Sequence, residues 1–134
     1  MIRHDPATVR AIEPRYREIY THAVETRPAG GRQLYVSGQV GIRPSGEVEA
    51  TFGDQCRRAL ENVEALLTAA GMSTEHIVKA TYFLTRREDL PELAAIRAER
   101  WGGVRPAVTT LVVSALAAPE LLVEVEVIAQ EEAG

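Results

Sequence analysis

RPAVTTLVVSALAAPELLVEVEVIA, residues 105–129, contains two strand patterns that decide how this chain folds. Near residues 107–114 the side chains are apolar on both faces, as in a strand that is buried on both sides. Near residues 121–130 apolar and charged residues alternate, with Glu124 and Glu126 on the same face, as in a half-buried strand. The two patterns predict a pair of final strands, and the first of them needs cover on both faces.

Upstream, two segments indicate another strand followed by a turn. Residues 33–38 alternate in polarity, and Gly38 and Gly41 bracket a second short strand or a bulge. The segment 43–47 has Pro early and Gly late, which is the chemistry of a turn. These features predict a β-hairpin before the first helix.

Two helices are predicted from a period of 3.6 residues and from signals at the helix ends. Between residues 51 and 70 one apolar stripe runs along the segment and stops at Gly71, the expected left-handed position. The residues of this stripe are Phe52, Cys56, Ala59, Leu60, Val63, Leu67 and Ala70. Asp89 followed by Glu92 has the spacing of a capping box and predicts a second helix that runs to Trp101.

The order of these elements predicts the fold class. Residues 76–85 alternate and predict a strand between the two helices. The order strand, strand, helix, strand, helix, strand, strand indicates an α+β fold with two helices on one face of the sheet. Since two helices in 134 residues cover only one face, the apolar strand 107–114 needs cover from another chain. We therefore expect an oligomer.

Length and composition bound the class of protein. The 134 residues fit a single domain, 1–134, and the charged fraction of 25% is typical of globular proteins. No run reaches the roughly 20 apolar residues of a membrane helix, and the opening residues are charged where a secretory signal is apolar. The single cysteine, Cys56, agrees with a reducing compartment, so we expect a cytoplasmic protein. A net charge of −4 without a basic stripe argues against nucleic acid as a partner.

Four motifs occur along the chain in a recognisable order. They are YVSGQVG at 35–41, NVEALLTAAGM at 62–72, IVKATYFLTRREDLP at 77–91 and the stretch 105–129. Together they resemble the Rid/YjgF family from about residue 18 to 130, with 1–17 as an N-terminal extension. The resemblance implies the chorismate mutase-like YjgF fold, with a mixed, mainly antiparallel sheet, and a homotrimer with small-molecule clefts between its subunits. The catalytic branch of the family hydrolyses enamines and imines to 2-oxo acids and ammonia.

The resemblance also implies a set of site residues. Glu124 aligns with the family's water-positioning Glu, and Tyr20 aligns with the Tyr of the cleft. Gly38 is expected to let the backbone approach the ligand, and Thr110 takes the place of a frequent Cys whose backbone N–H faces the substrate. Val108 stands where the catalytic branch has an Arg that binds the substrate carboxylate. The implied partner is a small molecule with a carboxylate or an imine.

Two of these positions have a second interpretation. From pattern alone, Glu124 and Glu126 are a solvated stripe on a half-buried strand. Val108 cannot bind a carboxylate, which needs a charge-assisted pair, and Ala94 lies near the place of an Asn that is frequent in the catalytic branch. Arg105 is not a simple replacement, because strand parity directs it to the other face. Two departures in one cleft predict a different ligand.

Other kinds of site have little support in the sequence. His4, His22 and His76 lack metal-ligand spacing and are interpreted as surface or strand residues, so no metal site and no cofactor are proposed. Ser37 lacks the glycine pattern of a nucleophile elbow, and there is no phosphate-binding loop. Ribonuclease labels are attached to the family, but an acidic chain without paired histidines gives them no physical support.

Three functional hypotheses follow. In the first, a Rid-type trimer binds a small metabolite in its clefts but lacks ordinary imine deaminase activity because of Val108. In the second, the protein is an enamine or imine deaminase, or a related C–N hydrolase, that uses Arg105, Arg43 or Arg32 of a neighbouring subunit. In the third, it has a structural or chaperone-like role and the clefts are incidental.

Overall fold

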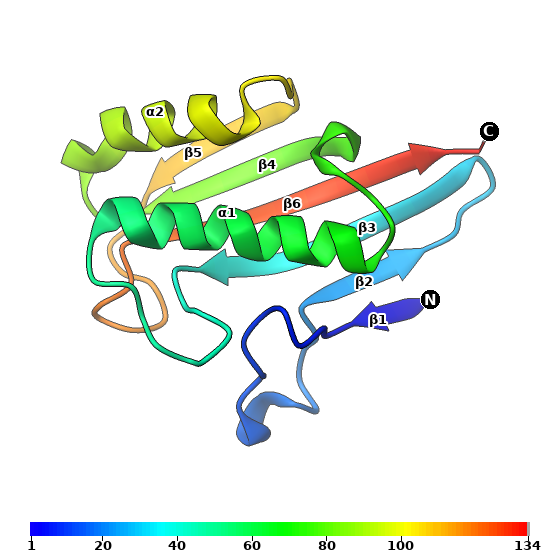
Figure 1. Ribbon diagram of the computed structural model, residues 1–134, viewed down its shortest axis with the longest axis horizontal. Helices are drawn as coiled ribbons and strands as arrows, with labels where there is room; N and C mark the ends of the chain where they lie inside the picture. The colour runs from blue at the N-terminus through cyan, green and yellow to red at the C-terminus, as the bar shows by residue number, and fades with distance from the viewer. Residues whose placement is uncertain (134) are drawn as a thin grey trace.

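Six strands form one mixed sheet in the computed structural model, which describes residues 1–133 (Figure 1). The strands are β1 (Ile2–His4), β2 (Ala23–Thr26), β3 (Gly31–Val40), β4 (Ile77–Leu84), β5 (Ala107–Val112) and β6 (Val123–Glu132). Their order across the sheet is β1-β2-β3-β6-β4-β5, and only β4 and β5 pair in parallel. The predicted α+β class with a mainly antiparallel sheet is confirmed.

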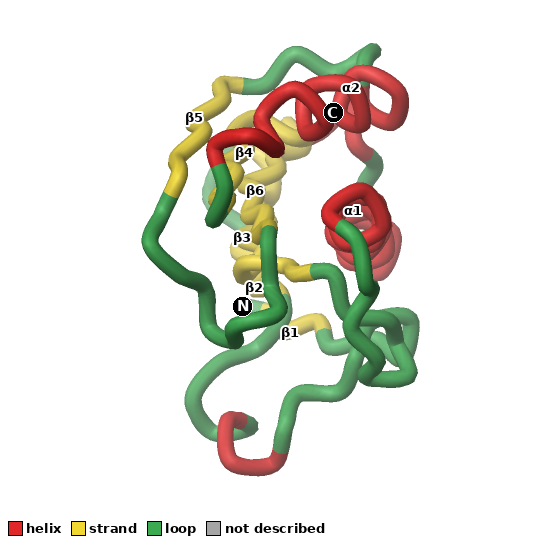
Figure 2. Tube along the Cα trace, turned by 90° about the vertical axis from the view of Figure 1, so that its left-hand side faces the viewer, coloured by secondary structure: helices red, strands yellow, loops and turns green. Residues whose placement is uncertain are grey.

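Two helices, α1 (Phe52–Ala69) and α2 (Leu90–Trp101), cover the same face of this sheet (Figure 2). All seven residues of the predicted stripe on the first helix are buried. The helix begins where the Thr51 side chain accepts a hydrogen bond of 3.1 Å from Asp54 N, and Gly71 follows its end with φ +70°. No helix within residues 1–133 has both the length and the apolar composition that a membrane crossing needs.

The predicted capping box at the start of α2 is wrong, although the helix itself has the predicted extent. Asp89 has helical backbone angles at the end of a 3-10 turn, Arg87–Asp89, and its side chain makes no capping hydrogen bond. The Asp89 carboxylate instead accepts two hydrogen bonds from Arg86, at 2.7 and 3.0 Å. The ion pair holds the carboxylate away from the helix N–H groups that a cap would satisfy.

The predicted hairpin before α1 is present, but it is short and follows a bulge rather than a second strand. β3 is one strand of ten residues, and its register with β6 shifts between Val36 and Gln39, so Gly38 lies in an irregularity of one strand. In the turn after it, Arg43 N donates to Glu47 O at 2.8 Å and Glu49 N donates to Gly41 O at 2.9 Å, and Ile42 and Val48 form an antiparallel bridge. The antiparallel partners of β3 in the sheet are β2, which residues 27–30 join to it, and β6, which comes much later in the chain.

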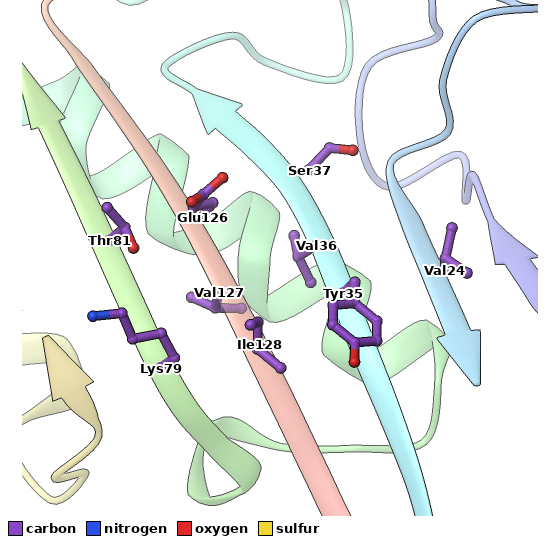
Figure 3. A pocket seen from close by; sticks show the side chains of 9 residues that line it. All are labelled: Val24, Tyr35, Val36, Ser37, Lys79, Thr81, Glu126, Val127 and Ile128. Atoms are coloured by element: carbon purple, nitrogen blue, oxygen red, sulfur yellow. The ribbon is translucent and has the colours of Figure 1, made fainter. Parts of the chain in front are cut away.

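The sheet leaves one face uncovered. On β6 the odd-numbered residues from Val123 to Ala129 face the helices and are buried, whereas Glu126 and Ile128 lie on the other face. Figure 3 shows these two side chains with Tyr35, Lys79 and Thr81 around a shallow hollow of about 370 Å³. On β5, Leu111 and Val112 are 45% and 47% exposed although they point to opposite faces. The single chain therefore leaves the apolar strand without the cover that its sequence requires.

Candidate functional site

Glu124, Tyr20 and Gly38 lie in one cleft, as the sequence analysis predicts. The cleft has a volume of about 840 Å³ and is formed by β3, β6, the loop before β6 and the N-terminal segment. Tyr20 precedes β2 and is not part of the first strand, so it reaches the cleft from a connection. Three residues that are distant in the sequence thus form one concave surface.

Gly38 and Glu124 are in close contact, so a side chain at position 38 would force the Glu124 carboxylate to move. A Cβ atom added to Gly38 would overlap the Glu124 carboxylate. The absence of a side chain therefore leaves room for the carboxylate between β3 and β6. The irregularity in the pairing of β3 with β6 therefore lies next to the Glu124 carboxylate.

The environment of Glu124 differs from that of its neighbour Glu126. Burial raises the pKa of Glu124, the charge of Glu126 raises it further, and the charge of Arg10 acts in the opposite direction. Within residues 1–133 the Glu124 carboxylate has no hydrogen-bond or ion-pair partner, so its oxygens are available to a water molecule or a ligand. Glu126 is exposed and Glu124 is half-buried. The interpretation as a uniformly solvated stripe therefore fails for Glu124.

Arg10 is a cleft residue that sequence reasoning missed. It lines the Glu124 cleft from the N-terminal segment, and its carbonyl oxygen accepts a hydrogen bond of 2.9 Å from His22 Nε2. The segment is held a second time by Asp5, which accepts hydrogen bonds from His22 N at 2.7 Å and from Thr21 Oγ1 at 2.6 Å. The residues called an extension therefore form one wall of the cleft.

His22 is the buried centre of this attachment, not a surface residue. Its Nδ1 accepts a hydrogen bond of 3.2 Å from the Gln39 side-chain amide, which places the ring proton on Nε2, where it bonds Arg10 O. Burial lowers the pKa of His22, and the hydrogen bond to the Arg10 carbonyl oxygen and the charge of Asp5 offset this only in part. The folded protein consequently keeps this imidazole neutral.

We predict that protonation of His22 destabilises the fold as the pH falls. Because its folded pKa lies below the ordinary 6.5, the unfolded chain takes up the proton first, and stability decreases as the pH falls through 6.5. Above about pH 7.5 both states are neutral and the effect disappears. Urea unfolding between pH 8 and 5.5 should show a larger loss of stability for the natural protein than for His22→Gln.

The matched control for this prediction is His76→Gln, at a partly exposed histidine. Glu124 contributes in the opposite direction, because its raised pKa makes the folded state bind the proton first as the pH falls. Glu124 is present in all three proteins, so the differences between them isolate each histidine. Equal pH slopes for His22→Gln and the natural protein would show that His22 is not the titrating group.

Val108 and Thr110 lie away from the Glu124 cleft. Lys79 Nζ donates a 2.7 Å hydrogen bond to Thr109 Oγ1 on the uncovered face of the sheet, so the alternation of β5 turns Val108 and Thr110 toward the helix side. Val108 lines a second pocket of about 400 Å³ between α2 and the start of β5. Glu124 and Val108 therefore do not meet within one chain.

The structure distinguishes between the three arginines considered as replacement cations. Arg32 is paired with Glu131 at 2.9 Å, and Arg43 is paired with Glu49 at 2.7 Å. Arg105 lines the same pocket as Val108. The parity argument that directed Arg105 to the other face is wrong, because β5 begins at Ala107 and Arg105 belongs to the preceding loop.

The three histidines have different partners. His4 Nε2 lies 3.0 Å from the buried Glu25 carboxylate, and His76 Nδ1 accepts a hydrogen bond from Ser73 N at 3.0 Å. Within residues 1–133 no group of three or more His, Cys, Asp or Glu side chains is arranged to hold a metal ion. The candidate chemistry of this chain therefore lies in the Glu124 cleft and the Val108 pocket.

A sheet of this order, with two helices on one face and a cleft beside an irregular third strand, defines a protein of the YjgF fold class. The family model described as Endoribonuclease L-PSP matches residues 10–131. The chain therefore belongs to this family, which is the YjgF/Rid family. The match begins before residue 18 and includes Arg10.

Three relatives illustrate the similarity. A RutC family protein of Pyrococcus horikoshii is 36% identical over 115 residues, which cover 84% of this chain and 87% of that protein. The structure of Escherichia coli TdcF with bound serine has a TM-score of 0.84 at 28% identity, covering 98% of this chain and 99% of TdcF. A Rid family protein of unknown function from Yersinia pestis has a TM-score of 0.81 at 35% identity, covering 95% and 96%.

Proposed function

We propose that the protein is a homotrimer that binds a small metabolite in clefts between subunits and lacks ordinary imine deaminase activity. The observation that carries the proposal is the separation of the site residues. Glu124, Tyr20 and Gly38 form one cleft, whereas Val108 lies in another pocket of the same chain. A complete site then requires the Glu124 cleft of one subunit and the Val108 pocket of its neighbour.

Two further observations support assembly. Leu111 and Val112 are exposed on opposite faces of an edge strand, and such apolar surface commonly marks a contact between chains. The uncovered face of the sheet carries Tyr35 and Ile128 beside the charged Lys79 and Glu126 (Figure 3). Partners with the same surface would bury these apolar groups while leaving the charges to pair across the contact.

The binding of a small metabolite is supported by the cleft and by one relative. The Glu124 carboxylate is unpaired within the described chain and has a raised pKa, which are properties of groups that position water or accept a ligand donor. TdcF, which shares the fold at 28% identity, was solved with bound serine. TdcF is also named as a candidate reactive intermediate deaminase and is 43% identical over 67 residues, about half of each chain.

The absence of ordinary deaminase activity follows from Val108. A three- or four-carbon imino acid has one strong directional contact to offer, its carboxylate, and an Arg side chain binds it with two charge-assisted hydrogen bonds. A valine offers no hydrogen bond at all. Without that contact the imine carbon is not held next to the water at Glu124, and proximity supplies much of the rate of such a reaction.

Ammonia release from freshly generated 2-iminobutanoate and 2-aminoacrylate tests this proposal. We expect no release above the spontaneous rate with the natural protein, and a measurable gain with Val108→Arg that the additional change Glu124→Ala removes. Val78→Arg is the matched control, because Val78 is a similarly exposed valine, at 46% against 43%, on the neighbouring strand. If the natural protein is active and Glu124→Ala is not, the proposal is wrong and the deaminase hypothesis replaces it.

Sedimentation velocity tests the assembly in the same samples. We expect three times the mass of one chain for the natural protein and a smaller species for Leu111→Lys, which places a charge on the apolar edge strand. A monomeric natural protein would contradict the proposal of an intersubunit site. A trimer that shows neither ammonia release nor calorimetric binding of serine or 2-oxobutanoate would favour the structural role instead.

A further inference from the structure

The pocket between α2 and the start of β5 combines an apolar lining with two cations. Tyr82, Trp101 and Val108 contribute apolar surface, and Arg97 and Arg105 contribute guanidinium groups. The remaining lining residues are Ala94, Ala98, Gly102, Val104 and Pro106. No carboxylate lines this pocket, although the chain as a whole has a net charge of −4.

We propose that this pocket binds a small organic carboxylate with a flat apolar body, and that Arg97 is the residue that anchors the carboxylate. Arg105 is its second cation. This inference rests on the proposed function, because the trimer would place the pocket beside a neighbouring subunit. It adds the chemical class of the ligand to that function.

Arg97 is suited to this role because its charge is not neutralised inside the chain. Eight other arginines form ion pairs with Asp or Glu: Arg15, Arg27, Arg32, Arg43, Arg57, Arg58, Arg86 and Arg100. Arg97 and Arg105 form none within residues 1–133. The Arg97 guanidinium instead lies 5.3 Å from the centre of the Tyr82 ring, a cation–π arrangement that restricts its position. A held guanidinium loses less freedom when it binds a carboxylate through two hydrogen bonds.

The floor beneath Arg97 is made of buried aromatic residues. Tyr82 is fully buried, its hydroxyl has no hydrogen-bond partner, and burial raises its pKa to about 12 against the opposing charge of Arg97. Trp101 is 4% exposed and donates a 2.9 Å hydrogen bond from Nε1 to Glu64, which fixes the indole ring. The buried rings lower the polarity on one side of the guanidinium, and this strengthens its contact with an anion.

The pocket has room for a ligand larger than a four-carbon imino acid. Ala94 and Val108 are small side chains on the two walls, one on α2 and one on β5. The volume of about 400 Å³ lies within the range of pockets that enclose drug-sized ligands. An aromatic or similarly flat group fits between these walls when its carboxylate lies at Arg97.

Trp101 provides a direct measurement, because it is the only tryptophan of the chain and lines the pocket. We would titrate the assembled protein with phenylacetate, butanoate and 2-phenylethanol, following Trp101 fluorescence and the heat of binding. Phenylacetate should bind most tightly, since it has both the charge and the flat body. Arg97→Gln should weaken its binding by about tenfold or more, and Arg97→Lys should weaken it less. Arg87→Gln, an exposed arginine without an ion pair in the described chain, is the control.

Each result has one meaning for the inference. Binding that is unchanged in Arg97→Gln, or absent from the natural protein, overturns it, provided that the melting temperatures of the proteins agree. The proposed function is tested separately, by sedimentation and by the release of ammonia from the two imino acids. Arg97-dependent binding by a monomer would support this pocket and contradict the trimer. A trimer in which ligand binding depends on Glu124 but not on Arg97 would support the proposed function and contradict this inference.

Discussion

Gln55→Leu is expected to lower the free energy of unfolding by about 2 kcal/mol or more, because it removes the hydrogen-bond partner of three backbone groups that are partly buried. The Gln55 amide nitrogen donates to Glu49 O at 3.1 Å and to Glu120 O at 2.8 Å. Its amide oxygen accepts from Leu122 N at 2.8 Å. Leucine fills a similar volume but forms none of these hydrogen bonds. The loops before α1 and β6 would both lose their attachment to the helix.

Guanidinium chloride unfolding, followed by circular dichroism at several protein concentrations, measures this loss and separates it from any effect of assembly. Gln33→Leu is the matched control, since the partly exposed Gln33 side chain near the start of β3 forms hydrogen bonds only with other side chains, those of Gln130 and Tyr35. We expect the control to change stability by less than about 1 kcal/mol. A Gln55→Leu protein within that range would show that water replaces the missing hydrogen bonds.

The helices show what a sequence pattern can and cannot predict. The apolar stripe from Phe52 to Ala70 is buried as predicted, because burial of one face follows directly from a period of 3.6 residues. Gln55 and Asn62 are buried on the same helix and were not predicted. Asn62 donates hydrogen bonds of 3.1 Å to Val40 O and Ile42 O, and such partners come from loops distant in the sequence. Polarity alone does not distinguish a side chain that bonds a loop from one that faces solvent.

The sequence predicted some residues of the candidate site but missed two of its arginines. The resemblance named Glu124, Tyr20 and Gly38, and these three residues do share a cleft. Arg10 was missed because it lies outside the motifs and reaches the cleft only through the hydrogen bond from His22 to its carbonyl oxygen. Arg97 was missed because it lies on the helix rather than on the strand where a cation was sought. A motif identifies a residue by its place in the sequence. A cation that reaches the same pocket from a different helix or strand is identified only from the folded structure.

Gly41→Ala is expected to destabilise the fold by about 3 kcal/mol, because the site has no room for one methyl group. An added Cβ at position 41 would overlap Cα and Cβ of Gln55 on α1, so the helix or β3 must move. Movement of the helix would also lengthen the hydrogen bonds from Gln55 to Glu120 and Leu122. The clash involves backbone rather than the flexible end of a side chain, and well-packed interiors relax little around such an insertion.

Gly103→Ala is the control that makes the Gly41 result interpretable. An added Cβ at Gly103 meets no atom within 4 Å, and the residue does not have a positive φ angle. Alanine there should leave stability unchanged within about 0.5 kcal/mol or raise it slightly, since it restricts the unfolded chain. Denaturant unfolding of both variants separates the clash with Gln55 from the loss of glycine flexibility. Both variants lose the flexibility of a glycine, but only Gly41→Ala has the clash. Equal changes at the two positions would mean that α1 is free to shift away from β3, and the close packing of Gly41 on Gln55 would then contribute little to the fold.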